Sequence, residues 1–237
     1  AMQQGSSGYN VGRTAAVAAG LPNTVSGMSL DRQCSSGMMA IATAAQQIVC
    51  DHMPVVVGAG LESISLVQNV HRTSYRAQDP NVIAKSEHAY MSMLETAETV
   101  AKRYNISRDL QDEYGLQSQQ RTAAAQAAGK FDDEIVPMAS KMVFVDKETK
   151  KQSVHDVTLD KDEGNRPTPT LEGHNGLKPV FEGGCITAGN ASQLSDGASA
   201  SVLMDSKLAE QKGLEPLGAY RGVAVAGLEP DEMGIGP

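Results

Sequence analysis

A single cysteine, Cys34, lies where thiol chemistry is favoured, between an extended segment and a helical one. In SLDRQCSSGMMAIATAAQQIVC the residues after it repeat apolar side chains at helical spacing, at Met38, Ile41, Ala42, Ala45, Ile48 and Val49. Cys34 is therefore predicted at or just before the first turn of a helix, where unpaired N–H groups and the helix dipole stabilise a thiolate, the nucleophilic form. Small residues follow at 35–37, so a large electrophile could approach the sulfur. On position alone, a buried structural thiol is an equally good interpretation.

A second stretch rich in small residues, TAGNASQLSDGA at 187–198, could lie close to a ligand. Asn190, Ser192 and Ser195 offer hydrogen-bonding groups there. The residues alone favour the alternative, a tight connection in which glycine and asparagine satisfy unusual backbone angles. Arg166, with Lys178 downstream, could pair with phosphate, although an exposed arginine is usually only a solvated charge.

Other candidate motifs are weak. VVVGAGLES, residues 55–63, has serine at the third glycine position of a dinucleotide-binding motif, so a tight strand-to-loop turn is the better interpretation. The histidines show no metal-ligand spacing and there is no CxxC pair, so no metal site is predicted. The three cysteines, Cys34, Cys50 and Cys185, are widely spaced, which favours free thiols in a reducing compartment.

The composition describes an ordinary globular protein with an acidic balance. Of 237 residues, 41% are hydrophobic and 20% are charged, and the net charge is −8. That charge argues against a general binder of nucleic acid or membrane surfaces, which are polyanionic, but a local basic cluster could hold a small anion. Apolar runs such as 54–59 are too short to cross a bilayer, and no targeting segment is visible. Because both ends look cut, we expect a fragment of a longer protein.

The elements that would position these residues alternate between helix and strand. A helix over 11–19 should end at the Gly-Leu-Pro of 20–22, followed by a strand over 24–30, the helix after Cys34 and a strand over 55–58. Strand, helix and buried strand in succession predict a βαβ unit with a parallel sheet covered on both faces.

The middle of the chain has a different character. Residues 63–94 are polar and show little periodicity, and they are too long for a simple connection, so they are predicted to be a functional excursion. Helices are predicted over 95–104 and from an N-cap at Ser107 to a stop at Gly129. The remaining predicted elements are short strands near Ile135 and Val143, a strand and turn at 186–192, a strand at 198–204, a helix at 206–213 and a strand at 217–227.

Several of these stretches, in this order, resemble the thiolase family. RQCSSGMMAI, residues 32–41, resembles the family's nucleophile motif in its degradative form, and GAGLESIS, residues 58–65, resembles the Gly-rich segment after the next strand. MLETAETVAKRYNISRDLQDEY and GKFDDEIVP resemble the family's inserted loop domain. ITAGNASQLSDGASA and EPDEMGIGP resemble the segments that lead back into the core. Linked motifs across essentially the whole chain are much more specific than any one of them.

The resemblance implies acyl transfer to coenzyme A with Cys34 as the nucleophile. In the family this cysteine is acylated when a 3-ketoacyl-CoA is cleaved between C2 and C3; acetyl-CoA leaves, and a second CoA takes the acyl group in a ping-pong cycle. The backbone N–H of Cys34 is implied to help hold the thioester oxyanion. The residues implied to bind coenzyme A are Ser192 and Ala188 along the pantetheine arm, Met93 and Phe181 as wall positions, and Arg166 beside the adenosine end.

The chain also departs from the family pattern. Ser92 stands where many members have a histidine. Members continue into a second α/β half, which supplies the Asn of N/H-E-A-F, the activating His of G-H-P and the proton-moving Cys of C-x-G-G-G. None of these motifs occurs in residues 1–237, and Cys50 and Cys185 lie in the wrong contexts to replace them. Residues 1–237 by themselves are therefore expected to be inactive.

The predicted fold class is α/β, a partial thiolase-like αβαβα architecture with an α-rich inserted loop domain. The predicted domains are an incomplete N-terminal core at 1–62, a CoA-binding loop domain at 63–184, and a return to the core with the start of the C-terminal half at 185–237. The expected parent function is thiolytic cleavage of 3-ketoacyl-CoA in fatty-acid β-oxidation, by an acetyl-CoA C-acyltransferase. The alternatives are biosynthetic acetoacetyl-CoA condensation, or a non-catalytic acyl-CoA-binding or assembly protein of the same fold.

The expected partners follow from the same resemblance. Coenzyme A is a substrate, and no tightly bound cofactor is expected. A homodimer or homotetramer is expected, with residues 71–83 where the family places a tetramerisation loop, and neither nucleic acid nor a membrane span. A bacterial-like cytoplasmic location is expected, with an organelle left open because the natural N-terminus looks missing.

Overall fold

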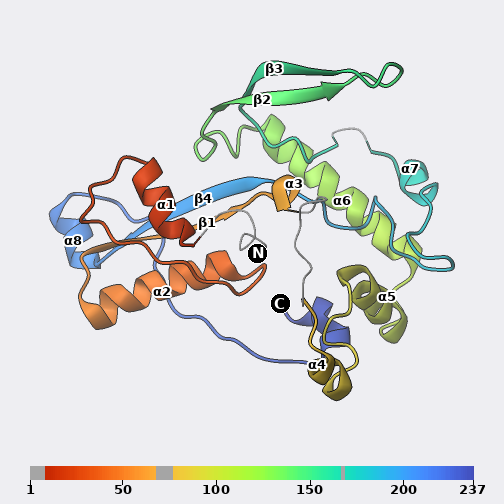
Figure 1. The fold of residues 1–237 in the computed structure, drawn as a ribbon, viewed down its shortest axis with the longest axis horizontal. Helices are drawn as coiled ribbons and strands as arrows, with labels where there is room; N and C mark the ends of the chain where they lie inside the picture. The colour runs from red at the N-terminus through yellow and green to blue at the C-terminus, as the bar shows by residue number, and fades with distance from the viewer. Residues whose placement is uncertain (1–8, 68–76, 167–168) are drawn as a thin grey trace. The chain divides into compact units, whose positions relative to one another are not determined.

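The structure, a computed structural model, describes residues 9–67, 77–166 and 169–237 (Figure 1). The chain divides into two compact units. Unit 1 consists of Ala1–Glu87 with Leu194–Gly227, and unit 2 consists of His88–Gln193 with Leu228–Pro237. The domain boundaries expected from the sequence, after 62 and after 184, stay a prediction.

Unit 1 is built on a strand pair. Strands β1 (Val55–Glu62) and β4 (Gly197–Met204) run antiparallel with Val55 opposite Met204 and Glu62 opposite Gly197. Helix α2 (Ser36–Asp51) packs along this pair (Figure 1). The other elements of the unit are α1 (Val11–Ala18), α3 (Ile64–Val67), α4 (Pro80–Lys85) and α8 (Ser206–Gln211).

Close packing of α2 on β1 depends on small residues on both elements. The buried residues of α2 are Ala42, Ala44 and Ala45. On β1, a Cβ at Gly58 would lie 2.9 Å from the Cα of Ile41, so only glycine permits this approach. Gly60 is less crowded, since its nearest neighbour would be the Cα of Gly37 at 3.7 Å. The helix that begins after Cys34 is therefore seated directly on the strand.

Two sequence predictions for unit 1 are wrong. Residues 24–30 form no strand, because the side chains of Asn10 and Ser29 tie this segment to the start of α1 in place of a strand ladder. As a result, the described residues contain no parallel βαβ pair, and β1 pairs with β4 in antiparallel fashion instead. The apolar face predicted for α2 is narrower than expected, because Met38 and Val49 are exposed.

Unit 2 is mainly helical. Its helices are α5 (Met93–Arg103), α6 (Arg108–Ala127), α7 (Leu171–Asn175) and the 3₁₀ helix η2 (Pro230–Ile235). The hairpin strands β2 (Met138–Val145) and β3 (Gln152–Leu159) pair antiparallel. The Ser107 N-cap predicted for α6 is confirmed, because its side chain accepts a hydrogen bond from the N–H of Leu110. Gly129, with φ 67°, follows the end of that helix as predicted.

The remaining element predictions divide between confirmed and wrong. The strand at 198–204, the helix at 206–213 and a strand through Val143 are confirmed. Ile135 lies outside any strand, 186–192 contains the turn but no strand, and 217–227 is irregular. These segments have extended-type sequences, but no neighbouring strand pairs with them within the described residues. Of the segment expected at 71–83, only 77–83 lies among the described residues.

None of the helices in the described part of the chain combines the length and apolar character needed to cross a membrane.

Candidate active site

Cys34 lies in a tight turn directly before α2. The N–H of Gln33 donates to Asp31 Oδ1 (2.7 Å), and the N–H of Arg32 donates to Ser36 Oγ (2.8 Å). Ser36 Oγ in turn donates to the carbonyl of Gln33 (2.6 Å). Gln33 takes a left-handed backbone with φ 48°, unusual for a residue other than glycine. The turn is thus held by side chains on both sides of the cysteine.

The Cys34 thiol is exposed, which disfavours a buried structural thiol. Ser35 is the N-cap of α2 and makes no side-chain capping bond, since its Oγ donates back to the carbonyl of Arg32 (2.9 Å). Cys50, near the other end of α2, is exposed as well. Exposure therefore does not distinguish the two thiols; what distinguishes them is the end of the helix at which each lies.

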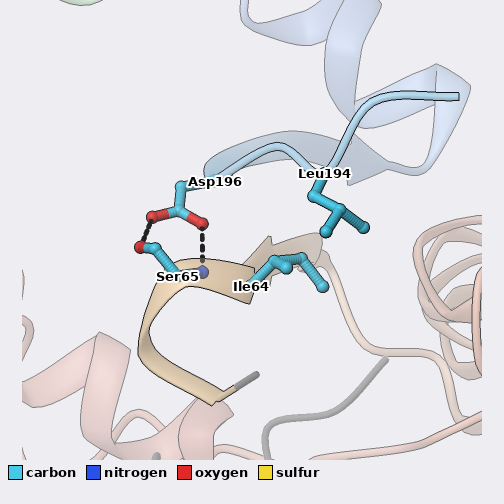
Figure 2. A pocket seen from close by; sticks show the side chains of 4 residues that line it. All are labelled: Ile64, Ser65, Leu194 and Asp196. Atoms are coloured by element: carbon cyan, nitrogen blue, oxygen red, sulfur yellow. Dashed lines mark hydrogen bonds between the residues drawn. The ribbon is translucent and has the colours of Figure 1, made fainter. Parts of the chain in front are cut away.

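The same unit contains a shallow pocket of about 400 Å³ lined by Ile64, Ser65, Leu194 and Asp196 (Figure 2). Asp196 lies just before β4 and binds the residues that follow β1: it accepts from the N–H and the hydroxyl of Ser65 and from the hydroxyl of Ser63. These bonds, with the Ser65 hydroxyl first, lower the pKa of Asp196. All its contacts join the ends of β1 and β4, so we assign this aspartate to the structure of the strand pair.

The second candidate region is the 187–191 turn of unit 2, which carries Ala188 and leads to Ser192. The turn is closed by a hydrogen bond from the N–H of Ala191 to the carbonyl of Thr187 (2.9 Å). Asn190 Oδ1 accepts from the N–H of Thr187 (2.8 Å), and its Nδ2 donates to the carbonyl of Cys185 (3.0 Å). Both polar atoms of the Asn190 side chain are therefore engaged in hydrogen bonds that shape the turn.

Two charged groups anchor this turn to the helices beneath it. On α6, the fully buried carboxylate of Asp112 accepts from Asn190 Nδ2 (3.0 Å) and from Arg108 Nε (2.7 Å). On α5, the carboxylate of Glu98 accepts from the N–H groups of Cys185 and Ile186, both at 2.9 Å. Burial alone would raise the pKa of Glu98, but these donors outweigh it and the pKa is lowered.

Cys185 itself is poorly suited to be a nucleophile. Its Sγ donates to Glu98 Oε2 and accepts from Gln111 Nε2, each at 3.2 Å. Partial burial, followed by the neighbouring Glu98 carboxylate, raises the pKa of the Cys185 thiol. This thiol is accordingly less available as a thiolate than an ordinary cysteine.

Arg166 is attached to the same helix that anchors the turn. Its N–H donates to Gln119 Oε1 (2.9 Å), and Asn165 Nδ2 donates to the carbonyl of Gln119 (2.9 Å). Gln119 follows Asp112 by two helical turns, so both lie on one face of α6, about 10 Å apart along its axis. Arg166 and the 187–191 turn are thus fastened to one side of one helix.

The five residues predicted to contact coenzyme A are all at the surface of unit 2. Met93, the first residue of α5, is 55% exposed and Phe181 is 39% exposed. Ala188, Ser192 and Arg166 are also exposed. Within the described residues the Arg166 guanidinium forms no ion pair. The roles of these five residues stay predictions, and all five residues are exposed enough for a ligand to reach them.

Ser92, where the family pattern has a histidine, has a definite structural task. Its hydroxyl accepts from the N–H of Glu95, and the Glu95 carboxylate accepts from the N–H of Ser92. This reciprocal pair is a capping box at the start of α5. The bonds to Ser92 lower the pKa of Glu95.

Sequence reasoning missed the residues that hold the turn from below, namely Glu98, Arg108, Asp112 and His174. An Arg and Asp four residues apart on a helix is an ordinary surface pattern. Only its burial gives the pair its importance, and no local sequence feature predicts that burial.

Comparison with known proteins identifies the family. Residues 1–207 match the family model described as "Thiolase, N-terminal domain". The chain is 42% identical to a peroxisomal 3-ketoacyl-CoA thiolase of Petunia hybrida, over 95% of this chain and 48% of that protein. It is 41% identical to the 3-ketoacyl-CoA thiolase of Bacillus subtilis, over 97% of this chain and 58% of that protein. The chain thus spans about half the length of these relatives.

Solved structures give the same result. The acetyl-CoA acetyltransferase of Bacillus anthracis matches with a TM-score of 0.78 at 42% identity, over 100% of this chain and 60% of that one. The human mitochondrial 3-ketoacyl-CoA thiolase in complex with CoA matches at 0.79 and 34% identity, over 100% and 59%. The dimeric peroxisomal thiolase of Saccharomyces cerevisiae matches at 0.79 and 31%, over 94% and 54%. The predicted partial α/β thiolase-like fold is confirmed, and the chain belongs to the thiolase family.

Proposed function

We propose that the protein carrying this chain is an acetyl-CoA C-acyltransferase that cleaves 3-ketoacyl-CoA thiolytically. Cys34 Sγ attacks the C3 carbonyl; the C2–C3 bond then breaks, its electron pair leaves with C2, and protonation of C2 gives acetyl-CoA. The sulfur of a second CoA attacks the resulting thioester, forming a shortened acyl-CoA and returning Cys34. Coenzyme A is here a substrate and not a resident cofactor.

The observation that carries this proposal is the exposed thiol of Cys34 in a chain of the thiolase family. The thiol lies in a hydrogen-bonded turn at the N-terminal end of α2. The backbone N–H of Cys34 is proposed to hold the oxyanion, while those of Ser35 and Ser36 donate to the carbonyls of Arg32 and Gln33. The small side chains of Ser35 and Ser36 leave access to the sulfur, and their hydroxyls bond back to the turn. The local structure therefore leaves the Cys34 sulfur accessible for nucleophilic attack.

We place the CoA subsite on unit 2. Arg166 and the 187–191 turn lie along one face of α6, a spacing suited to an elongated ligand with an anionic end. Arg166 would meet the adenosine phosphates, while Ala188 and Ser192 would line the pantetheine arm and Met93 and Phe181 its walls. Coenzyme A as the ligand is supported by the human mitochondrial relative, whose structure was solved in complex with CoA.

Proton transfer needs residues that 1–237 do not contain. The N/H-E-A-F, G-H-P and C-x-G-G-G motifs of the family are absent from these residues. We therefore propose that residues 1–237 alone do not catalyse turnover.

The organisation and location of the protein are proposed as follows. The domains divide after 62 and after 184. A homodimer or homotetramer is proposed, supported by the dimer named among the solved relatives. A cytoplasmic location is supported by the bacterial relative, and the peroxisomal relatives leave an organelle open.

The second candidate function is biosynthetic condensation of two acetyl-CoA molecules. It is favoured by the match to the Bacillus anthracis acetyl-CoA acetyltransferase, which is as close in identity as the match to the Petunia thiolase. Comparing thiolysis of acetoacetyl-CoA with that of a long-chain 3-ketoacyl-CoA separates the two: preference for the long chain supports the degradative role, and activity confined to acetoacetyl-CoA supports the biosynthetic one.

The decisive test is acylation of Cys34 in the protein as its gene encodes it. After incubation with acetyl-CoA, peptide mass spectrometry should find one acetyl group on Cys34. The Cys34→Ser variant should lose thiolysis and keep its CoA affinity, and Cys50→Ser, an exposed thiol on the same helix, is the matched control that should keep both. Turnover retained in Cys34→Ser would refute the assignment. Binding of CoA without acylation would instead support the non-catalytic acyl-CoA binder.

A further inference from the structure

His174, in the short helix α7, is buried without a use for one of its ring nitrogens. The residue is 7% exposed, and its Nδ1 has no hydrogen-bond partner among the described residues. Its carbonyl is engaged, since it accepts from Arg108 Nη2 (2.9 Å). A buried polar atom without a partner is destabilising. Hydrogen bonding by Nδ1 therefore does not explain why the ring lies there.

The ring does have a packing role, because it lies between two backbone segments that both carry glycine. A Cβ at Gly189, in the 187–191 turn, would lie 3.2 Å from His174 Nδ1 and 2.7 Å from Leu177 Cδ1. A Cβ at Gly115, on α6, would lie 3.6 Å from His174 Cε1 and 3.0 Å from the carbonyl oxygen of Gly189. A side chain at Gly189 would therefore have no room between Leu177 and the imidazole of His174.

The hydrogen bonds that fasten this region to α5 and α6 are made on either side of Gly189. Asn190 is bonded to Asp112 on one side, and Glu98 holds the residues before the turn on another. At Gly189 itself, an added Cβ would meet the ring of His174 and the side chain of Leu177, and the Gly189 carbonyl oxygen lies beside Gly115 of α6. A smaller or displaced ring would let the peptide at 188–190 sink or tilt.

We propose that His174 is a positioning residue: its ring holds the 187–191 turn in the position relative to α6 that binding of coenzyme A requires. The inference rests on the proposed CoA subsite, because Ala188 is in the turn and Ser192 follows it directly. Because the His174 ring is buried, we assign it no direct contact with the substrate. It acts by supporting Gly189, so its loss should weaken binding of coenzyme A without altering acyl transfer once the substrate is bound.

The test is a double-mutant cycle between His174 and Gly189, with free coenzyme A as the ligand and isothermal calorimetry as the measurement. His174→Ala should weaken CoA binding about fivefold, the equivalent of one hydrogen bond lost at the turn. His174→Leu refills the space and should restore affinity to within about twofold of wild type. Gly189→Ala alone should also weaken binding, but Gly189→Ala combined with His174→Ala should do so less than the product of the two single effects, because the new methyl occupies the vacated space.

The matched control is His155→Ala on the exposed hairpin strand β3, which should leave affinity unchanged. In steady-state thiolysis by the protein as its gene encodes it, His174→Ala should raise KM and leave kcat within twofold, a split that simple unfolding would not produce. If His174→Ala does not fold, His174→Leu together with Gly189→Ala still tests the contact. Affinities within twofold of wild type in His174→Ala, or strictly multiplicative effects in the cycle, would overturn the inference. Wild-type protein that binds no CoA would instead overturn the proposed function.

Discussion

The buried carboxylate of Asp112 makes the sharpest stability prediction, tested by Asp112→Asn. One oxygen of Asp112 accepts from Arg108 Nε, and the other accepts from Asn190 Nδ2. Asparagine has the same shape but only one acceptor. Whichever way the new amide turns, its NH₂ group faces a donor, and the Arg108 guanidinium loses its counter-charge.

The magnitude follows from burial. Breaking a buried ion pair costs about 3–5 kcal/mol. Asp112 is fully buried, but the Arg108 side chain is 22% exposed and also donates to the carbonyls of His174 and Leu177. We therefore expect the low end of that range, about 3 kcal/mol.

The matched control is Asp156→Asn. Asp156 pairs with Lys141 at 2.9 Å across the β2–β3 hairpin, and both side chains are more than 70% exposed. An exposed pair of this kind contributes about 0–1 kcal/mol. The two variants thus make the same chemical change at similar ion-pair distances and differ in burial.

The assay is urea unfolding followed by circular dichroism at 222 nm. With a denaturant slope of about 2 kcal/mol/M, Asp112→Asn should lower the midpoint by about 1.5 M and Asp156→Asn by less than about 0.5 M. Hydrogen exchange at the Thr187 amide, which donates to Asn190, should also accelerate in Asp112→Asn. If both variants unfold at the same urea concentration, the reasoning from burial is wrong.

Three further predictions follow from the same structure. Gly58→Ala should destabilise by about 1–3 kcal/mol, since the methyl meets the Ile41 backbone, while Gly60→Ala, with 3.7 Å of space, should be nearly neutral; equal urea midpoints would contradict this. The pKa of Glu98 is lowered in the folded chain, so its contribution to folding stability is present above the unfolded value of 4.5 and is lost as the pH falls through the lower folded value. Glu98→Gln should therefore reduce the fall of the urea midpoint with pH below 4.5. An unchanged dependence of the midpoint on pH would argue against this role. Arg166→Gln should weaken CoA binding and reduce its salt dependence, measured by calorimetry at two ionic strengths, and an affinity equal to wild type would remove this residue from the subsite.

Local sequence patterns predicted the features of this chain that depend on neighbouring residues. The N-cap at Ser107, the stop at Gly129, the helix after Cys34 and the strand at 198–204 all follow from chemistry within a few residues. The thiolase resemblance was also readable, because its motifs are linear and occur in a fixed order. The exposure of Cys34 agrees with its predicted place just before the helix.

Tertiary structure decided what no local pattern contains. Residues 24–30 have an extended-type sequence, but Asn10 and Ser29 bind the segment to α1, so no ladder forms. The small residues of 187–191 predicted either a ligand-binding stretch or a tight turn, and the structure makes Asn190 a turn-former anchored on Asp112. No sequence pattern singled out His174, and only the fold placed its ring beside Gly189. The sequence by itself determined the family and the nucleophile candidate; the fold decided which polar groups are buried, because burial depends on contacts between residues far apart in the chain.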